Sequence, residues 1–336
     1  MRQDVNYGLW YDFRNPAQWR QDFEEFYRER LQQIREAEDK GFSSVWLTEH
    51  HFCDDGYTPS PLVVASAIAA QTRKMHLGTN LMLLPLADPI RVAEDAATLS
   101  LISGGRFDLG VGIGYRQMEF DQFGRKLSHR PSLMEEGIEV LRRAWSGKPV
   151  NFSGKRFEVG DLCVTPAPVH TPGVYLGGMA PPAIERAARV ADGFLSTGGI
   201  GMDSYCEFLD KQGKADQGRI VLGCWAIIAE DPEREAARIG DHLIYQTNAY
   251  SQWGAFGPPD QAPVYDNWKD VVENGLYELW DADTAVSRLT EMVKTYPQIC
   301  DIHFWAQFPG ESVASGNARL DYIAEKVLPR LRQAAA

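Results

Sequence analysis

The chain has 336 residues and a formal net charge of −12. An acidic surface repels nucleic acids and anionic membranes, so we expect neither as a partner. With 44% hydrophobic residues the chain can bury a sizeable core, and α/β barrels often reach this length as one unit. We therefore expect one domain spanning residues 1–336.

The cysteines are odd in number, scattered and without CxxC spacing: Cys53, Cys163, Cys206, Cys224 and Cys300. This pattern is typical of reduced thiols rather than of a disulfide framework or a zinc site, so we expect no metal. Cys53 follows a histidine pair, but a plain loop thiol is the favoured interpretation. Because there is no N-terminal signal pattern and no apolar run long enough to cross a bilayer, we expect a cytoplasmic protein.

Short apolar strands alternate with amphipathic helices along the chain, which predicts parallel β/α units. The expected strands are residues 7–10, 45–47, 76–84, 106–112, 174–176, 193–195, 220–229 and 299–305. The expected helices are residues 16–40, 62–71, 90–102, 130–145, 181–191, 233–250, 283–294 and 320–332. Eight such units predict an eight-fold β/α (TIM) barrel.

Two segments interrupt the alternation. Residues 150–169 are predicted to form an inserted β-hairpin. Residues 250–279 hold several aromatic residues and three prolines without a clear period, which predicts a long loop before the last strand. Long irregular segments are usually functional, so we expect this one to be a mobile lid.

Glu49, His50 and His51 directly follow the buried run 45–47. In a TIM barrel the carboxyl ends of the strands hold the chemistry, and buried polar groups there need partners or a function. Residue type alone leaves structural and catalytic roles for the histidines equally open. Glu49 and His51 could set the tautomer of His50, or Glu49 could bind the loop after the next strand. Trp10 could line the substrate face or belong to the core.

Glycines at 110, 112 and 114 superficially match a dinucleotide-binding turn. They lie partly within a predicted strand and a long loop follows, so we reject that interpretation. Two explanations stay open. The glycines allow close packing of the strands, or they make room for a flat ring.

The stretch 176–183 runs from a strand through small residues into a helix that begins with prolines. The free N–H groups at such a helix N-terminus favour an anion. Arg130, which opens another predicted helix, could add a fixed positive charge to the same anion or be an ordinary surface arginine.

Together these segments resemble the bacterial luciferase-like family of flavin-dependent barrels. The matching blocks, in the family's order, are residues 45–52 (VWLTEHHF), 77–85 (LGTNLMLLP), 89–95 (PIRVAED) and 103–107 (SGGRF). Weaker blocks at 123–124, 130–145, 175–178 and 327–329 extend the likeness over nearly the whole chain. No single block would suffice, and their joint occurrence makes the resemblance specific.

The resemblance implies a barrel that binds reduced FMN or, in related branches, a deazaflavin. It places the catalytic histidine at His50, a non-prolyl cis peptide at Asn80–Leu81 and a phosphate-contacting arginine at Arg130. The expected cofactor-binding residues are Asn80, Leu81, Gly112, Arg130, Gly177, Gly178, Met179 and Ala180. The family's cysteine and second arginine near the flavin are replaced by Gly112 and Ile113. Its polar phosphate ligands are replaced by Met179, Ala180 and Ala183, so backbone N–H groups there must provide more of the hydrogen bonds to the phosphate.

We therefore expect a flavin-dependent monooxygenase that oxidises a small organic substrate with molecular oxygen. Because the chain has no nicotinamide-binding fingerprint, reduced FMN should come from a separate flavin reductase. A homodimer or higher homo-oligomer is expected. Two alternatives remain: a deazaflavin-dependent hydride-transfer oxidoreductase, which the acidic balance of the chain slightly disfavours, and a non-catalytic flavin-binding subunit.

Overall fold

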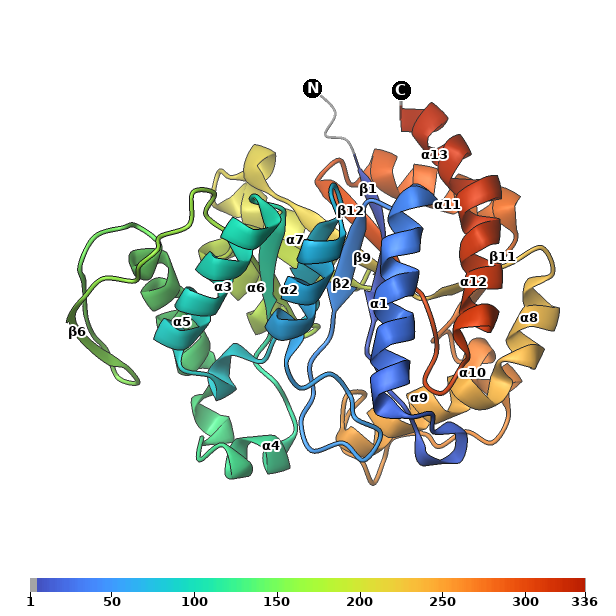
Figure 1. Ribbon diagram of the computed structural model, residues 1–336, viewed down its shortest axis with the longest axis horizontal. Coiled ribbons are helices and arrows are strands. Elements are labelled where there is room, and N and C mark those ends of the chain that lie inside the picture. Colours follow the sequence, from blue (N-terminus) through green and yellow to red (C-terminus); the bar gives the residue numbers. More distant parts are fainter. Residues whose placement is uncertain (1–4, 336) are drawn as a thin grey trace.

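The computed structural model describes residues 5–335. Eight parallel strands close into a barrel in the order β1-β12-β9-β8-β7-β4-β3-β2. They are β1 (Asn6–Tyr11), β2 (Ser44–Leu47), β3 (His76–Thr79), β4 (Phe107–Val111), β7 (Val174–Gly177), β8 (Gly193–Thr197), β9 (Ile220–Cys224) and β12 (Ile299–Trp305). Figure 1 shows the barrel from the side, with β1, β2, β9 and β12 labelled. The predicted β/α barrel is confirmed.

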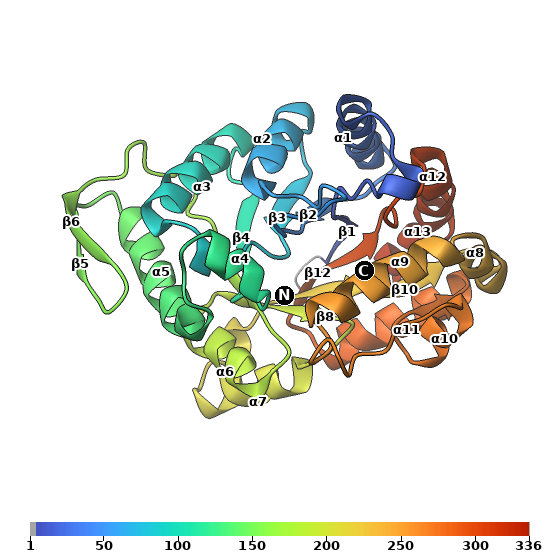
Figure 2. The same ribbon diagram turned by 90° about the horizontal axis from the view of Figure 1, so that it is seen from below.

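Helices surround the strands on the outside (Figure 2). They are α1 (Phe23–Asp39), α2 (Pro61–Gln71), α3 (Pro89–Ser103), α5 (Arg130–Ala144), α6 (Pro181–Val190), α7 (Met202–Lys211), α11 (Ala282–Thr295), α12 (Val313–Tyr322) and α13 (Leu328–Ala335). The limits of α3 follow from local chemistry. The Asp88 side chain caps its first N–H groups, Pro89 fits its first position, and Gly104 ends it with φ 66°. No helix in residues 5–335 is long and apolar enough to cross a membrane.

Large indole side chains fill the barrel because the facing strands carry glycine. A Cβ atom on Gly78 would lie 2.2 Å from the Trp46 ring, and one on Gly223 would lie 2.7 Å from the ring of Trp10. Trp46 and Trp10 are 1% and 5% exposed. Larger residues at either glycine would therefore displace the side chains that close the barrel beneath its carboxyl rim.

The insertion after α5 forms the predicted hairpin. Strands β5 (Val150–Ser153) and β6 (Glu158–Leu162) pair antiparallel, and the hairpin projects away from the barrel in Figure 1. None of its described residues lines the cavity described below, so we assign it no part in that site.

The prediction of a long irregular loop over residues 250–279 is wrong in its detail. Helix α9 (Gly240–Trp253) continues into this segment, which also holds α10 (Trp268–Glu273) and β11 (Glu278–Trp280). Strand β11 pairs parallel with β10 (Ala226–Ile228) outside the barrel. Elements this short span fewer than two helical turns or two strand periods, so they leave no periodic signal.

Several boundaries also differ from the prediction. The strand predicted over 76–84 ends at Thr79, because the chain turns into a 3₁₀ segment, Leu84–Leu86. The strand predicted over 220–229 is β9 followed by β10, and the helix predicted over 233–250 is α8 (Pro232–Arg238) followed by α9. Helices α4 (Gln117–Gln122) and α7 were not anticipated.

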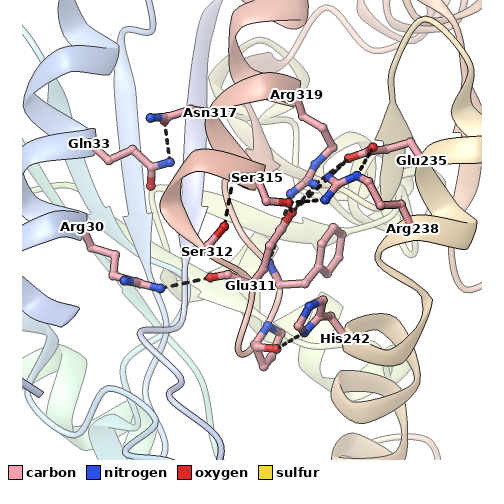
Figure 3. Close-up of polar contacts among 12 residues, drawn as sticks. Arg30, Gln33, Glu235, Arg238, His242, Glu311, Ser312, Ser315, Asn317 and Arg319 are labelled. Atoms are coloured by element: carbon pink, nitrogen blue, oxygen red, sulfur yellow. Dashed lines mark hydrogen bonds and ion pairs between the residues drawn. The ribbon is translucent and has the colours of Figure 1, made fainter. Parts of the chain in front are cut away.

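A buried ion-pair network fixes α8 and α9 against the segment between β12 and α12 (Figure 3). Both terminal nitrogens of Arg319 donate to the Glu311 carboxylate, over 2.5 and 2.6 Å, and one also donates to Glu235 over 2.8 Å. His242 Nδ1 lies 2.9 Å from the Pro309 carbonyl oxygen. Because Glu235 is on α8 and His242 is on α9, these contacts hold both helices beside the carboxyl rim.

Candidate active site

A cavity of about 520 Å³ opens at the carboxyl ends of the barrel strands. It is lined by all nine residues that the sequence predicts for the site: His50, Asn80, Leu81, Gly112, Arg130, Gly177, Gly178, Met179 and Ala180. They come from the segments after β2, β3, β4 and β7 and from the start of α5. Closure of the barrel brings together residues that are 130 positions apart in the chain.

Both ring nitrogens of His50 have polar partners. Its Nδ1 lies 2.9 Å from Glu119 Oε1, and its Nε2 lies 3.1 Å from the Tyr115 hydroxyl. The rings of Tyr57 and Trp253 pack around it, with centroids 4.9 and 5.1 Å away. His50 is 5% exposed. These contacts fix the position of the imidazole and exclude most water from it.

The charges around His50 define its tautomer. Burial lowers the pKa of His50, although Glu119 opposes this shift. Burial would raise the pKa of Glu119, but hydrogen bonds from His50 and the His51 N–H, with the charge of Arg116, bring it below its ordinary value. An ionised carboxylate can only accept, so Nδ1 of neutral His50 carries the proton and Nε2 accepts from Tyr115. This arrangement presents a base at the cavity.

Glu119, and not the side chain of Glu49 or His51, holds Nδ1 of His50, and His51 reaches this pair only through its backbone N–H, 2.9 Å from Glu119 Oε1. Glu49 Oε1 lies 3.1 Å from His51 Nε2, and its other oxygen accepts from the Leu83 N–H. Leu83 belongs to the loop after β3, so the alternative role given to Glu49 is correct. His51 is half-buried and faces Phe123, at 4.7 Å between ring centroids.

The glycines of the cavity wall serve close packing first. A Cβ atom on Gly112 would lie 2.3 Å from the Leu81 side chain, and one on Gly177 would lie 2.6 Å from it. One on Gly110 would lie 1.8 Å from the Thr79 carbonyl oxygen. The missing side chains thus let Leu81 lie across the ends of β4 and β7 as part of the cavity floor. The Asn80–Leu81 peptide is cis, as the family resemblance implies.

Behind the floor, Asn80 Nδ2 lies 3.0 Å from Nε2 of His303, which is fully buried inside the barrel. The other ring nitrogen of His303 lies 3.5 Å from the Asp301 carboxylate, and burial lowers the pKa of His303. A neutral ring with its Nδ1 proton towards the carboxylate accepts from the Asn80 amide nitrogen. The Asn80 side-chain oxygen is then left as an acceptor at the cavity.

The other end of the cavity holds donors for an anion. Arg130 Nη1 donates to the Gly114 carbonyl over 3.2 Å, which orients the guanidinium at the start of α5. Pro181 and Pro182 have no N–H, and the Ala183 N–H bonds the Ala180 carbonyl. Within residues 5–335 no acceptor is bonded to the N–H groups of residues 178–180, so these donors are available to a ligand.

Comparison with known proteins identifies the family. Residues 6–282 match the sequence model of the family described as "Luciferase-like monooxygenase". The chain belongs to this family.

Curated relatives of this luciferase-like chain have different activities. An F420-dependent glucose-6-phosphate dehydrogenase of Nakamurella multipartita is 26% identical over 88% of the chain and 90% of its own length. The alkanal monooxygenase alpha chain of the Kryptophanaron alfredi symbiont is 32% identical over 39% of the chain and 36% of its own. Several others are matched over about half of their length, such as 57% of an F420-dependent glucose-6-phosphate dehydrogenase of Amycolatopsis mediterranei.

Solved structures share the fold at lower identity. Monooxygenase RslO1 from Streptomyces bottropensis has a TM-score of 0.82 at 21% identity, covering 97% of the chain and 99% of its own. The oxygenating constituent of 3,6-diketocamphane monooxygenase from Pseudomonas putida, in complex with FMN, has a TM-score of 0.77 at 17% identity. The match covers 97% of this chain and 98% of that one. An F420-dependent secondary alcohol dehydrogenase has a TM-score of 0.74 at 20% identity, and the match covers 98% of this chain and 99% of that one. The similar proteins thus include one solved in complex with FMN and several named as F420-dependent enzymes.

Sequence reasoning missed Glu119 and the aromatic residues around the histidine in this luciferase-like barrel. Glu119 lies on α4, whose six residues are too few to show a helical period. The spacing of Arg116 and Glu119, three apart and 3.0 Å from each other in the structure, was the available signal. No cluster of three or more potential metal ligands occurs in the described part of the chain.

We expect Glu119→Gln to lower turnover and to move the acid limb of the pH–rate profile to lower pH. The carboxylate raises the pKa of His50 against burial, so its loss leaves that pKa lower still and the neutral base persists further into acid. The amide can also donate to Nδ1, which would favour the wrong tautomer. The measurement is kcat against pH for both proteins. An unmoved acid limb would show that His50 is not the titrating base.

Proposed function

We propose that the protein is a flavin-dependent monooxygenase that uses reduced FMN, delivered by a separate reductase, and oxygen to oxidise a small organic substrate. The observation that carries this proposal is the buried His50 base, held by Glu119 and Tyr115, beside a cavity with anion donors at its far end. The absence of a nicotinamide-binding fingerprint from the sequence supports a separate reductase. The intact catalytic histidine argues against a non-catalytic subunit.

The residues present fit an FMN molecule. The three unbonded N–H groups of residues 178–180 and the free nitrogens of Arg130 would bind its phosphate, and Leu81 would support its ring. When bound, the flavin supplies the two-electron chemistry that activates oxygen. The protein supplies the rest: His50 Nε2 takes or returns a proton at the reacting group, Tyr115 relays it, and Tyr57 and Trp253 exclude water.

A deazaflavin-dependent hydride transfer is the second candidate, because one local feature favours it. A groove of about 610 Å³ adjoins the cavity and shares Arg130 with it. Arg125 and Lys126 also line this groove, with Asp121 as its one acidic residue. F420 has a longer acidic tail than FMN, and these cations would attract it whatever the net charge of the chain. The F420-dependent relatives support the same alternative.

Anaerobic titration of the cofactor-free protein with reduced FMN and with reduced F420 distinguishes the two candidates. We expect reduced FMN to bind more tightly than oxidised FMN and more tightly than reduced F420. Tighter binding of F420, weakened by Lys126→Ala but not by an exposed-lysine control such as Lys211→Ala, would replace the monooxygenase proposal with the hydride-transfer one.

We expect Arg130→Ala to weaken FMN binding by about 1.5–3 kcal/mol, the range of a charge-assisted hydrogen bond. Riboflavin, which lacks the phosphate, should bind both proteins equally. Fluorescence titration with both ligands measures the difference. Equal losses for FMN and riboflavin would show that Arg130 acts on the ring or on folding.

The lid prediction now applies to a shorter segment. Gly254, Ala255 and Phe256 line the cavity directly after α9, and the turns up to residue 267 are mostly exposed. We expect a bound cofactor to protect residues 254–267 from limited proteolysis, because the ligand would order the turn that covers it. Cleavage there at the same rate with and without cofactor would indicate a fixed loop.

A further inference from the structure

A second, smaller chamber of about 240 Å³ adjoins the cavity on the side of β8 and β9. The two share four lining residues: Met179, Thr197, Trp225 and Phe256. Because the same four residues line both spaces, the chamber lies directly beside the main cavity. The groove with Arg125 and Lys126 has no lining residue in common with the chamber.

The chamber has an apolar lining. Leu222, Cys224, Leu276, Trp280 and Met292 contribute most of the remaining wall, and Glu278 is its one charged residue among the described lining. The Glu278 carboxylate accepts a hydrogen bond from Trp280 Nε1 over 3.0 Å. A negative charge at the edge of an apolar space disfavours an anionic occupant.

The mouth of the chamber exposes three large apolar side chains from three separate segments. Met179 follows β7, Ile200 follows β8 and Phe256 follows α9, and they are 48%, 50% and 38% exposed. Exposed apolar side chains are common singly, but their gathering around one opening marks a surface that an apolar ligand covers.

The charges of the main cavity also favour an uncharged substrate. Among the described residues that line it, Arg130 is the one Lys or Arg side chain, and the neutral His50 supplies no second cation. If the cofactor phosphate binds Arg130, no fixed positive charge is left for a phosphate on the substrate. The site therefore offers a substrate apolar contacts instead.

We propose that this chamber binds the uncharged, apolar arm of the substrate. The enzyme then acts on an aliphatic or cyclic organic compound whose reacting group lies near His50 and whose hydrocarbon part lies among Ile200, Leu222 and Met292. This inference rests on the proposed function in placing the reaction at His50 and the cofactor phosphate at Arg130. It holds for either candidate cofactor, and it excludes phosphorylated sugars as substrates.

The test uses straight-chain primary alcohols from 1-butanol to 1-decanol as probes, with binding followed by tryptophan fluorescence and checked by calorimetry. Burial of each CH₂ group should tighten Kd about fourfold until the chamber is full. Ile200→Lys, which places a charge at the mouth, and Ile200→Trp, which fills it, should both flatten this dependence on chain length. Val264→Lys is the matched control, because Val264 is 70% exposed and lines neither space.

Folding and cofactor binding are read separately from the same proteins. Ile200 is half exposed, so both variants should keep the wild-type unfolding midpoint and cofactor affinity. Kd values that do not depend on chain length, or a dependence that both Ile200 variants retain, would overturn the proposal. A dependence of Kd on chain length that is lost only in the Ile200 variants would support the chamber proposal. If neither FMN nor F420 bound in the same proteins, the proposed function would be rejected and the chamber proposal would stand.

Discussion

His50→Ala should reduce the rate of substrate oxidation by about 10²–10⁴, the usual contribution of a general acid or base. Its Nε2 is the basic atom held at the cavity, and removing the ring leaves the Tyr115 hydroxyl without its acceptor. Glu119 keeps bonds to the His51 N–H and to Arg116, at 2.9 and 3.0 Å, so the buried carboxylate stays partnered and the fold should persist. Stopped-flow product formation with saturating cofactor measures the effect.

His51→Ala is the matched control for this prediction. It removes an adjacent imidazole that pairs with Glu49 and not with Glu119, so we expect a small change in rate. Cofactor affinity should be nearly the same in both variants, because the phosphate donors lie at the other end of the cavity. Added imidazole should partly restore His50→Ala by occupying the space that the side chain leaves. Near-normal product yield in His50→Ala, or a greater loss in His51→Ala, would reject the assignment of the base.

The sequence allowed the barrel and its rim to be predicted because both depend on local signals. The run 45–47 is apolar and bounded, so the residues after it could be placed at a strand end. Strand ends gather at one rim in any parallel barrel, which is why Gly178 could be expected on the same rim as His50. Arg130 opens a helix, and only the family resemblance placed it at this site. Glu119 could not, because the turn through Arg116 that aims it at His50 has no periodic pattern.

Contacts that depend on closure of the barrel were also out of reach. His303 lies 223 positions from Asn80, and only the pairing of β12 with β1 and β9 brings it beneath the cavity floor. The apolar chamber is similar, since β9, β11 and α11 are individually ordinary and enclose a space only in combination. Long-range packing of this kind has no counterpart in a local pattern of residue types.

Glu311→Ala should reduce the free energy of unfolding by about 3–5 kcal/mol, the range for breaking a buried ion pair. Arg319 is 4% exposed and donates through both terminal nitrogens to Glu311, so removal of the carboxylate leaves a buried positive charge with only Glu235 beside it. Urea unfolding measures the loss. Glu94→Ala, which breaks an exposed pair with Arg91, is the control and should cost at most about 1 kcal/mol.

The same pair predicts how stability depends on pH. Burial would raise the pKa of Glu311, but the charge and hydrogen bonds of Arg319 bring it below the ordinary value. A carboxyl whose pKa is lower in the folded state stabilises fully above its unfolded pKa, and that contribution is lost as pH falls through the folded pKa. Wild type should therefore lose more stability than Glu311→Ala on acidification below about pH 4.

Because the network fixes α8 and α9, and α9 carries Tyr250 to the cavity and Trp253 against His50, the variant should also bind cofactor more weakly. Parallel acid profiles for the two proteins, with unchanged cofactor affinity, would show that the network neither stabilises the fold nor positions the site.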